Sequence, residues 1–400
     1  MDSVISVLVL YADYSVRASY YDDWIEAFIE SRFFNTVSIN ICDSDIKRKL
    51  YHALPDMDAV VLLHSTNADQ LFYLEPIVPI LENCKAKVFS FVGNEVNLPG
   101  APIEPKRKIL SQLNPDYIAT QLLQEAGDYL WGDIAPVVSV PHALNPKSFF
   151  KTTLLKERPL DLGVRSFRYP PHLGDDDRNR LMDYFQVISD SRGLRVDIGE
   201  ERLDRQGWAA FLNSTRGTLA TEAGSWYLSR SDQFIDDIQN YVRSQNRRGI
   251  VLSAENSRLR RIAHKLPWWV RQLILKALRG GPIRYESTLT SELSFDEIYE
   301  KFFKSRERAP VYTKCISSRH FDAMGTGTGM ILFKGRYNDI LVPDLHYFAL
   351  EHDFSNIDEI LARFEDPGQL QDITEASLEH ALGHHTYTHR VETIASILNE

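Results

Sequence analysis

Short apolar runs alternate with helical patterns along most of this sequence, and that rhythm constrains the fold more than any other feature. An apolar run at 3–10 precedes an amphipathic helical pattern over 20–31, and apolar runs at 58–64 and 86–92 flank a further helical pattern over 68–84. Two parallel neighbouring strands need a long crossover connection, which is usually a helix, whereas a tight hairpin joins antiparallel strands. Strands that alternate with helices are therefore typical of a parallel sheet. The sequence therefore predicts the α/β class with parallel sheets.

The alternation stops once and then restarts, which divides the chain into two parts. The segment 141–146 carries two prolines, and after a polar stretch the pattern resumes with an expected strand over 160–165. A chain of 400 residues is long for a single core and fits two domains of roughly 150–200 residues. We expect an N-terminal domain over 1–150 and a C-terminal domain over 151–400, whose last helix is a candidate for packing back on the first domain.

The rhythm is lost again between about 226 and 305, which predicts an insertion in the second domain. The formal net charge of the chain is −10, yet the stretch 258–284 holds eight Lys and Arg residues and no Asp or Glu. A nucleic-acid-binding domain is usually basic over a whole face. One basic island in an acidic chain indicates a local anionic target, and no nucleic-acid partner is expected.

The basic island contains a helical pattern with one basic face and a pair of tryptophans. Its residues of interest are Lys265, Trp268, Trp269, Arg271 and Lys276. Such a helix is typical of an interfacial helix that lies on anionic lipid. The alternative is a helix that packs on the protein and exposes its basic residues to water.

The cysteines favour a reducing compartment, and the hydropathy argues against a membrane-spanning helix. The chain has only three cysteines, none in CxxC spacing, which argues against a disulfide scaffold or a zinc site. No stretch approaches the ~20 apolar residues that a membrane-spanning helix requires. We expect a cytoplasmic protein, with the inner face of the membrane as a candidate location.

Several motifs, taken in order, resemble a known family. They are VPHALNP (140–146), DLGVRSFRYPPHLG (161–174), WAAFLNSTRGTLATEAGS (208–225), the segment 316–350 and EHDFSNIDEI (351–360). In this order they resemble group 1-type glycosyltransferases, in the branch related to spore-maturation and surface-polysaccharide transferases. The resemblance implies the GT-B fold: two Rossmann-like domains that face a central cleft, with the nucleotide-sugar donor on the C-terminal domain and the acceptor on the N-terminal one.

The resemblance implies an arginine at a strand end that grips the leaving diphosphate. Arg165 ends the first expected strand of the second domain, and its basic helper is Arg168, Arg178 or Arg180. A guanidinium can bind phosphate oxygens with two parallel hydrogen bonds. The alternative for Arg165 is a solvated loop residue.

A second set of donor residues begins an expected helix. Ser317 and Arg319 would bind phosphate beside the helix N-terminus, and Asp322 would bind ribose hydroxyls, unless it only complements the helix dipole. Many family members carry two glutamates separated by seven residues, but Lys314 stands at the first position here. We therefore take Glu222 as the acid that contacts the donor sugar.

The remaining site candidates follow other expected strands. Tyr337 lies in a loop that resembles a donor loop of the family, and His64, Asn94, Glu95 and His142 are candidates for the acceptor site. His64 or Glu95 could act as a general base if the reaction inverts, and a turn histidine or a solvated acid is the alternative for each. No metal motif follows a strand, so we expect metal-independent chemistry without a cofactor.

Together these features predict transfer of a sugar from a nucleotide-sugar donor to a surface-glycan or lipid-linked acceptor at the cytoplasmic membrane face. The resemblance alone favours retention over inversion. Two other classes stay open: a GT-B-type sugar-nucleotide epimerase, and a non-catalytic transferase-like binding or scaffold subunit.

The basic island yields a test. Charge reversal at Lys265, Arg271 and Lys276 is expected to abolish sedimentation of the protein with anionic liposomes, because the attraction of a basic face to anionic lipid is lost. Pelleting that persists would show that the insertion is not a membrane anchor.

Overall fold

The computed structural model describes residues 4–13, 19–245, 250–252, 283–285 and 294–400. The membrane candidates Lys265, Trp268, Trp269, Arg271 and Lys276 lie outside these residues. Within them, no helix is both long enough and apolar enough to cross a membrane.

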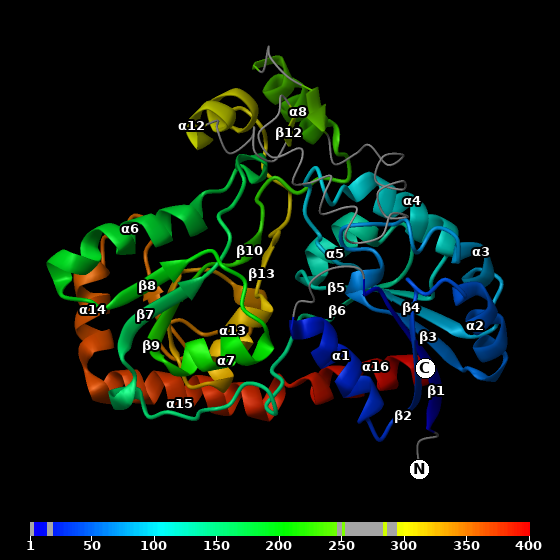
Figure 1. Cartoon of the computed structure of the whole chain (residues 1–400), viewed down its shortest axis with the longest axis horizontal. Coiled ribbons are helices and arrows are strands. Elements are labelled where there is room, and N and C mark those ends of the chain that lie inside the picture. Colours follow the sequence, from blue (N-terminus) through cyan, green and yellow to red (C-terminus); the bar gives the residue numbers. More distant parts are fainter. Residues whose placement is uncertain (1–3, 14–18, 246–249, 253–282, 286–293) are drawn as a thin grey trace.

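The N-terminal domain is built on a six-stranded parallel sheet with the strand order β2-β1-β3-β4-β5-β6 (Figure 1). Its strands are β1 (Ile5–Tyr11), β2 (Phe34–Asn40), β3 (Ala59–Leu62), β4 (Lys87–Phe91), β5 (Tyr117–Thr120) and β6 (Val137–Ser139). Its helices are α1 (Ser19–Ile29), α2 (Ile46–Ala53), α3 (Val78–Leu81), α4 (Ile103–Leu113) and α5 (Gln124–Trp131).

Strand β1 shows why the apolar runs are continuous. Val7 and Val9 pack on the face covered by α1, whereas Leu8 and Leu10 pack on the opposite face, which α2 to α5 cover. A parallel strand with both faces buried has no polar side to alternate with, so it is apolar along its length.

The helical pattern predicted over 68–84 is wrong for most of its length. Only α3 (Val78–Leu81) and a series of turns form there. Pro76 and Pro79 lie within the segment, and a proline inside a helix removes an amide donor and clashes with the preceding turn.

The C-terminal domain holds a five-stranded parallel sheet with the order β8-β7-β9-β14-β15. Its strands are β7 (Leu160–Arg165), β8 (Val196–Gly199), β9 (Thr215–Ala220), β14 (Gly329–Phe333) and β15 (Phe348–Leu350). Its helices are α6 (Asp177–Arg192), α7 (Arg205–Asn213), α13 (Ser318–Gly325), α14 (Ile357–Glu365) and α15 (Pro367–His384). The α/β class with two doubly wound, Rossmann-like domains is thereby confirmed.

Two chain segments cross between the domains. After α15, the last helix α16 (Tyr387–Asn399) runs under the N-terminal sheet, where Tyr387, Val391 and Ile394 pack with Trp24 of α1 (Figure 1). Leu144 of the linker exchanges backbone hydrogen bonds with this crossing, since its amide donates to His385 and its carbonyl accepts from Tyr387. The linker and the final helix therefore enter the interface together.

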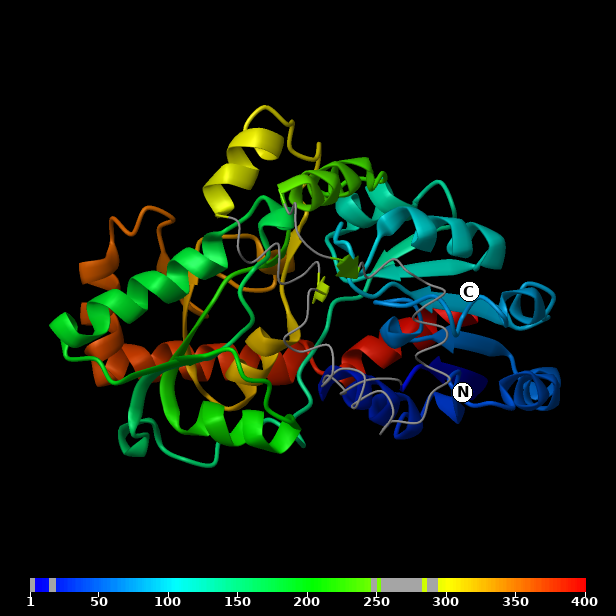
Figure 2. The same ribbon diagram turned by 45° about the horizontal axis from the view of Figure 1, so that its top comes forward.

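A small helical unit lies above both domains in Figures 1 and 2. It contains α8 (Gln233–Gln245), α12 (Phe295–Ile298) and a π-helical turn (Tyr299–Phe303), and it rises from the antiparallel pair β10 (Ala223–Gly224) and β13 (Lys314–Cys315). The strands β11 (Ile250–Leu252) and β12 (Ile283–Tyr285) pair in parallel. Asn97 of the N-terminal domain holds this unit, because its side-chain amide donates to Asp232 at 2.7 Å and accepts from the Ser229 amide at 2.9 Å.

Arg158 connects separate segments of the C-terminal domain through its side chain. Its guanidinium is almost fully buried and donates to the carbonyls of Leu212, Thr215 and Thr326 at 2.7–3.2 Å. Arg158→Leu removes all of these buried hydrogen bonds, so we expect a loss of about 3–5 kcal/mol in unfolding free energy, measured by urea denaturation.

The matched control is Arg195→Leu. Arg195 pairs with Asp161, but its side chain is 58% exposed, so its loss should cost less than about 1 kcal/mol. Equal effects of the two substitutions would contradict the proposed structural role of Arg158.

Candidate functional site

A hollow opens at the carboxyl ends of β7 and β9. In the order β8-β7-β9 the chain first adds a strand on one side of β7 and then on the other, so the helices leave in opposite directions at this point. In doubly wound sheets such a switch point leaves a crevice where ligands bind. The hollow encloses about 520 Å³, including the open space at its mouth. Its lining includes Arg165, Ser166, Arg178, Trp208, Ser317 and Arg319.

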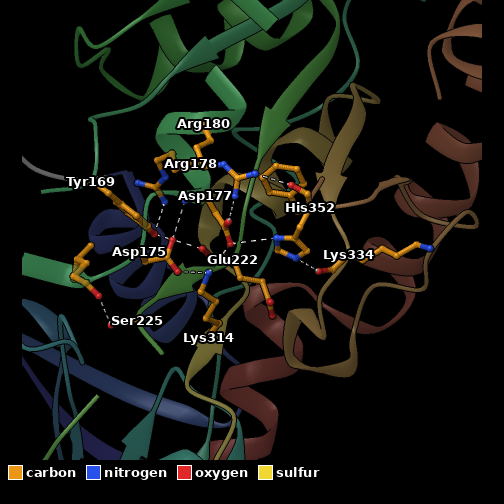
Figure 3. A network of polar contacts seen from close by, with 12 residues as sticks. Tyr169, Asp175, Asp177, Arg178, Arg180, Glu222, Ser225, Lys314, Lys334 and His352 are labelled. Carbon is orange, nitrogen blue, oxygen red and sulfur yellow. Dashed lines mark hydrogen bonds and ion pairs between the residues drawn. The ribbon is translucent and has the colours of Figure 1, made fainter. Parts of the chain in front are cut away.

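Two of the arginines in this lining have no carboxylate partner among the described residues. Arg319 of α13 donates from Nη1 to Ser166 Oγ at 2.8 Å. Arg178 of α6 donates to Tyr169 Oη at 2.8 Å, and its guanidinium lies 3.8 Å from the centre of that ring (Figure 3). Burial, and then the positive charge of Arg178, lower the pKa of Arg319 to about 10. Within the described part of the chain, neither guanidinium is thus neutralised by an ion pair.

The N-terminus of α13 adds to this charge. Ser317 caps the helix, and its hydroxyl and amide both contact His320 Nδ1, at 3.0 and 3.1 Å. The first turn of a helix presents unsatisfied amide groups that favour anions. Ser317 and Arg319, both named from the sequence, therefore line the hollow from one helix start.

Arg165 also lines the hollow, but its charge is already balanced. Its guanidinium forms ion pairs of 2.7 Å with Asp197 and with Glu201, and it lies 4.1 Å from the centre of the Phe211 ring. Asp197 lies within β8, and Glu201 lies in the loop after it. Arg165 therefore ends β7 beside the hollow, and its charge is balanced by these two acids.

Glu222 follows β9 and turns toward the loop after β14 instead of toward the arginines. Its carboxylate accepts from the Tyr337 amide at 2.7 Å and from the Tyr312 hydroxyl. Burial raises its pKa. Gly335 permits this approach, since a Cβ there would lie 2.3 Å from Glu222 Oε2.

Tyr337 is fully buried, and its hydroxyl donates to the Phe333 carbonyl at 2.7 Å. Tyr337, Asn338 and Asp339 all have left-handed backbone, with φ of 45°, 55° and 57°. Such strain, about 1–3 kcal/mol for each residue, persists only where surrounding contacts fix it. Here the contacts are Glu222 and the bond from Asn338 to the Gln121 carbonyl of the N-terminal domain.

Asp322 faces the domain interface. Its carboxylate accepts from Trp208 Nε1 at 2.9 Å, and Trp208 also lines the hollow. Burial, and then the nearby Asp23 of α1, raise the pKa of Asp322 well above its usual value. Asp23 itself accepts from Asn145 at 2.7 Å and lies 3.3 Å from Arg205. Asp322 therefore stands beside the hollow, within a cluster shared by both domains.

The acceptor candidates of the N-terminal domain differ in exposure. His64 is buried between the rings of Trp24, Phe91 and His142. Burial holds the pKa of His64 well below its usual value and lowers that of His142 to about 3. Both imidazoles are thus neutral interior groups near the β1–β3 switch point.

Glu95 and Asn94 follow β4. Glu95 is buried and accepts three hydrogen bonds of 2.6–2.7 Å, from Thr120, Gln121 and Trp131. Asn94 is exposed and donates to Asp69. Of these two, Asn94 is the side chain that a ligand can reach.

One polar cluster was not found from the sequence. Lys314 is buried between Asp175 and Asp177, and Asp177 also lies 3.4 Å from His352 Nδ1 (Figure 3). In the sequence Lys314 is visible only as a break in the family spacing. The cluster unites three distant segments, so no local pattern could have revealed it. The run of three acids at 175–177 was the one visible signal. Among the described residues, no group of three or more His, Cys, Asp and Glu side chains is arranged to hold a metal ion.

Comparison with known proteins gives distant structural likenesses only. No protein-family model and no curated protein matches the chain. The HepE protein of Anabaena, solved with UDP-glucose, is similar over 98% of this chain and 99% of its own, at 9% identity and a TM-score of 0.49. Sucrose-phosphate synthase of Thermosynechococcus elongatus is similar over 98% of both chains, at 9% identity and a TM-score of 0.47. A glycosyltransferase of Rickettsia africae is similar over 98% of this chain and 97% of its own, at 11% identity and a TM-score of 0.47. Likenesses this distant give no residue a role.

The cluster around Asp23 predicts a pH dependence of stability. Burial is the main reason that the pKa of Asp23 rises from 3.8 to about 7. The folded state then binds this proton more tightly than the unfolded state, so the contribution of Asp23 to stability falls as the pH rises from about 4 to 7, by at most about 1.4 kcal/mol per pH unit. Asp23→Asn should remove this contribution, so stability measured by urea unfolding should fall less steeply across that range than in the unmodified protein.

The control for this prediction is Asp22→Asn, which removes a neighbouring carboxylate 3.4 Å from Arg205 and leaves Asp23 in place. The control should keep the fall in stability. An Asp23→Asn protein whose stability declined as steeply as that of the unmodified protein would contradict this assignment.

Proposed function

We propose that this protein is a glycosyltransferase that uses a nucleotide-sugar donor. One observation carries the proposal: Arg178 and Arg319, which have no carboxylate partner among the described residues, line a hollow at the β7–β9 switch point together with the start of α13. A diphosphate carries at least two negative charges and many acceptor oxygens, which two guanidinium groups and a helix N-terminus complement.

The chemistry of glycosyl transfer needs such a site. When the bond between sugar and diphosphate breaks, negative charge grows on the leaving oxygen. Fixed cations that face this oxygen stabilise the transition state more than the ground state. We assign this work to Arg178 and Arg319, with Ser166 and Ser317 as further hydrogen-bond donors. The proposed reaction draws on these side chains and on no metal ion or cofactor.

The acid candidates take different parts in this proposal. Asp322 is proposed to bind the ribose end of the donor, and its hydrogen bond from Trp208, which lines the hollow, supports this role. Glu222 supports the loop 335–337 through the Tyr337 amide, and through that loop it orients the donor sugar. Retention is proposed on the family resemblance.

The acceptor is proposed to bind across the interface, on the N-terminal domain. A surface glycan or a lipid-linked acceptor at the cytoplasmic membrane face fits the basic island at 258–284. Asn94 is the exposed side chain at the end of β4, whereas His64, Glu95 and His142 are buried. We therefore expect Asn94 to contact the acceptor and the other three to shape the wall behind it.

The central test is binding of UDP, GDP and ADP by calorimetry. The unmodified protein should bind at least one of them, and Arg178→Ala and Arg319→Ala should each weaken that binding by about 1.5–3 kcal/mol, the range for a charged hydrogen bond. Arg165→Ala should have a smaller effect, since two acids already balance that charge.

Arg168→Ala is the matched control. Arg168 pairs with Asp183 and Glu200 and does not line the hollow, so its loss should leave affinity unchanged. Incubation with nucleotide sugars then separates the functional classes: release or transfer of the sugar supports a transferase, interconversion of the donor indicates an epimerase, and binding without turnover indicates a scaffold. A protein that binds none of the three nucleotides overturns the proposal.

A further inference from the structure

Lys314 is a buried cation held between two carboxylates. Its side chain is 3% exposed and forms ion pairs with Asp175 and, at 3.2 Å, with Asp177. Burial lowers the pKa of Lys314, but the two carboxylates outweigh burial and leave that pKa raised. Burial alone would raise the pKa of Asp177, yet its hydrogen bond with His352 and the charge of Lys314 bring it to about 2. Lys314 and Asp177 are therefore charged at neutral pH.

This cluster joins the two elements that carry the uncompensated arginines. Lys314 lies in β13, three residues before the cap of α13, and α13 carries Arg319. Asp175 and Asp177 stand at the start of α6, whose first turn carries Arg178 (Figure 3). We call this cluster of Lys314, Asp175 and Asp177 the bridge. Its lysine and its two acids are more than a hundred residues apart in the chain, so the spacing between α6 and α13 depends on contacts such as these.

The same bridge is tied to the segment that follows β9. Gly224 of β10 pairs with Lys314 of β13, and Glu222 directly precedes β10. A Cβ at Gly224 would lie 2.6 Å from the Thr313 carbonyl, so this pairing allows no side chain there. Lys314 is thus fixed by backbone pairing on one side and by ion pairs on the other.

A bridge between α6 and α13 can hold two like charges close together. Arg178 and Arg319 carry like charges, and the charge of Arg178 lowers the pKa of Arg319. Like charges close together repel each other. If α6 and α13 were free to move apart, the ligand would have to bring them together again, and binding would weaken by that cost.

We propose that Lys314, together with Asp175 and Asp177, is a positioning residue that sets the spacing of Arg178 and Arg319 to match two linked phosphate groups. The inference rests on the proposed function for the identity of the anion. The inference goes beyond the proposed function, because it says that the preference for a diphosphate over a monophosphate depends on Lys314. This lysine does not line the hollow.

The test compares inorganic pyrophosphate with inorganic phosphate as calorimetric probes of the full chain. Lys314→Met should weaken pyrophosphate binding by about tenfold or more, while phosphate binding changes by less than about threefold, because one phosphate needs only one guanidinium. Lys314→Arg, which keeps the charge, should restore part of the preference. Lys156→Met, which removes one exposed positive charge elsewhere, should change neither affinity.

A second variant and a second readout keep the inference open to refutation. If Lys314→Met does not fold, Asp177→Asn keeps the pair between Lys314 and Asp175 and should still lower the preference for pyrophosphate. Hydrogen exchange without ligand should show faster exchange at amides of 177–182 and 318–321 in either variant. A folded variant with an unchanged preference and unchanged exchange overturns the inference.

The outcomes also separate this inference from the proposed function. If the unmodified protein binds pyrophosphate but no nucleoside diphosphate, the donor proposal fails. The role of the bridge is then decided by the pyrophosphate and phosphate affinities of the Lys314 variants. If it binds neither anion, the proposed function fails at its anion site, and unchanged exchange in the variants would then overturn the bridge as well.

Discussion

The switch in strand order between β7 and β9 governs where the residues proposed to bind the donor can lie. A parallel sheet needs crossover helices, and at the switch point successive helices leave toward opposite faces. The carboxyl ends of β7 and β9 are therefore left uncovered by these helices. The residues proposed to bind the donor lie at these strand ends or beside them. The segments that bring them are widely separated in the chain: the end of β7, the start of α6, the end of β9 and the start of α13.

Charge balance, more than the presence of charge, distinguishes the residues in the hollow. Arg165 contributes a guanidinium that Asp197 and Glu201 neutralise. Arg178 and Arg319 contribute guanidinium groups that, among the described residues, donate to a phenol and a hydroxyl. Behind them, Lys314 sits between two acids. The positive potential is thus concentrated at Arg178 and Arg319, because Arg165 and Lys314 are paired with acids.

The two domains use their switch points differently. In the C-terminal domain the crevice is lined by Arg178 and Arg319, whereas near the corresponding point of the N-terminal domain His64 and His142 are packed among aromatic rings. The interface between the domains is held by charge at Arg205 and Glu26, by Asn338 on the Gln121 carbonyl, and by the apolar face of α16. The strained turn at Tyr337 to Asp339 contacts both domains, through Gln121 of the N-terminal domain and Glu222 of the C-terminal domain.

Local patterns were enough to establish the α/β class, the restart of the alternation after 141–146 and the places of Arg165 at a strand end and Ser317 at a helix start. These features depend on neighbouring residues, since strand and helix periodicity and capping are local. The same reasoning wrongly predicted a helix over 68–84 that two prolines prevent.

The charge balance of the site, in contrast, came from the folded arrangement alone. Asp197 and Glu201 neutralise Arg165, Glu222 turns to the Tyr337 amide, and Lys314 meets Asp175 and Asp177. Such pairings depend on which distant segments come within a few ångströms of each other, and local patterns do not encode that.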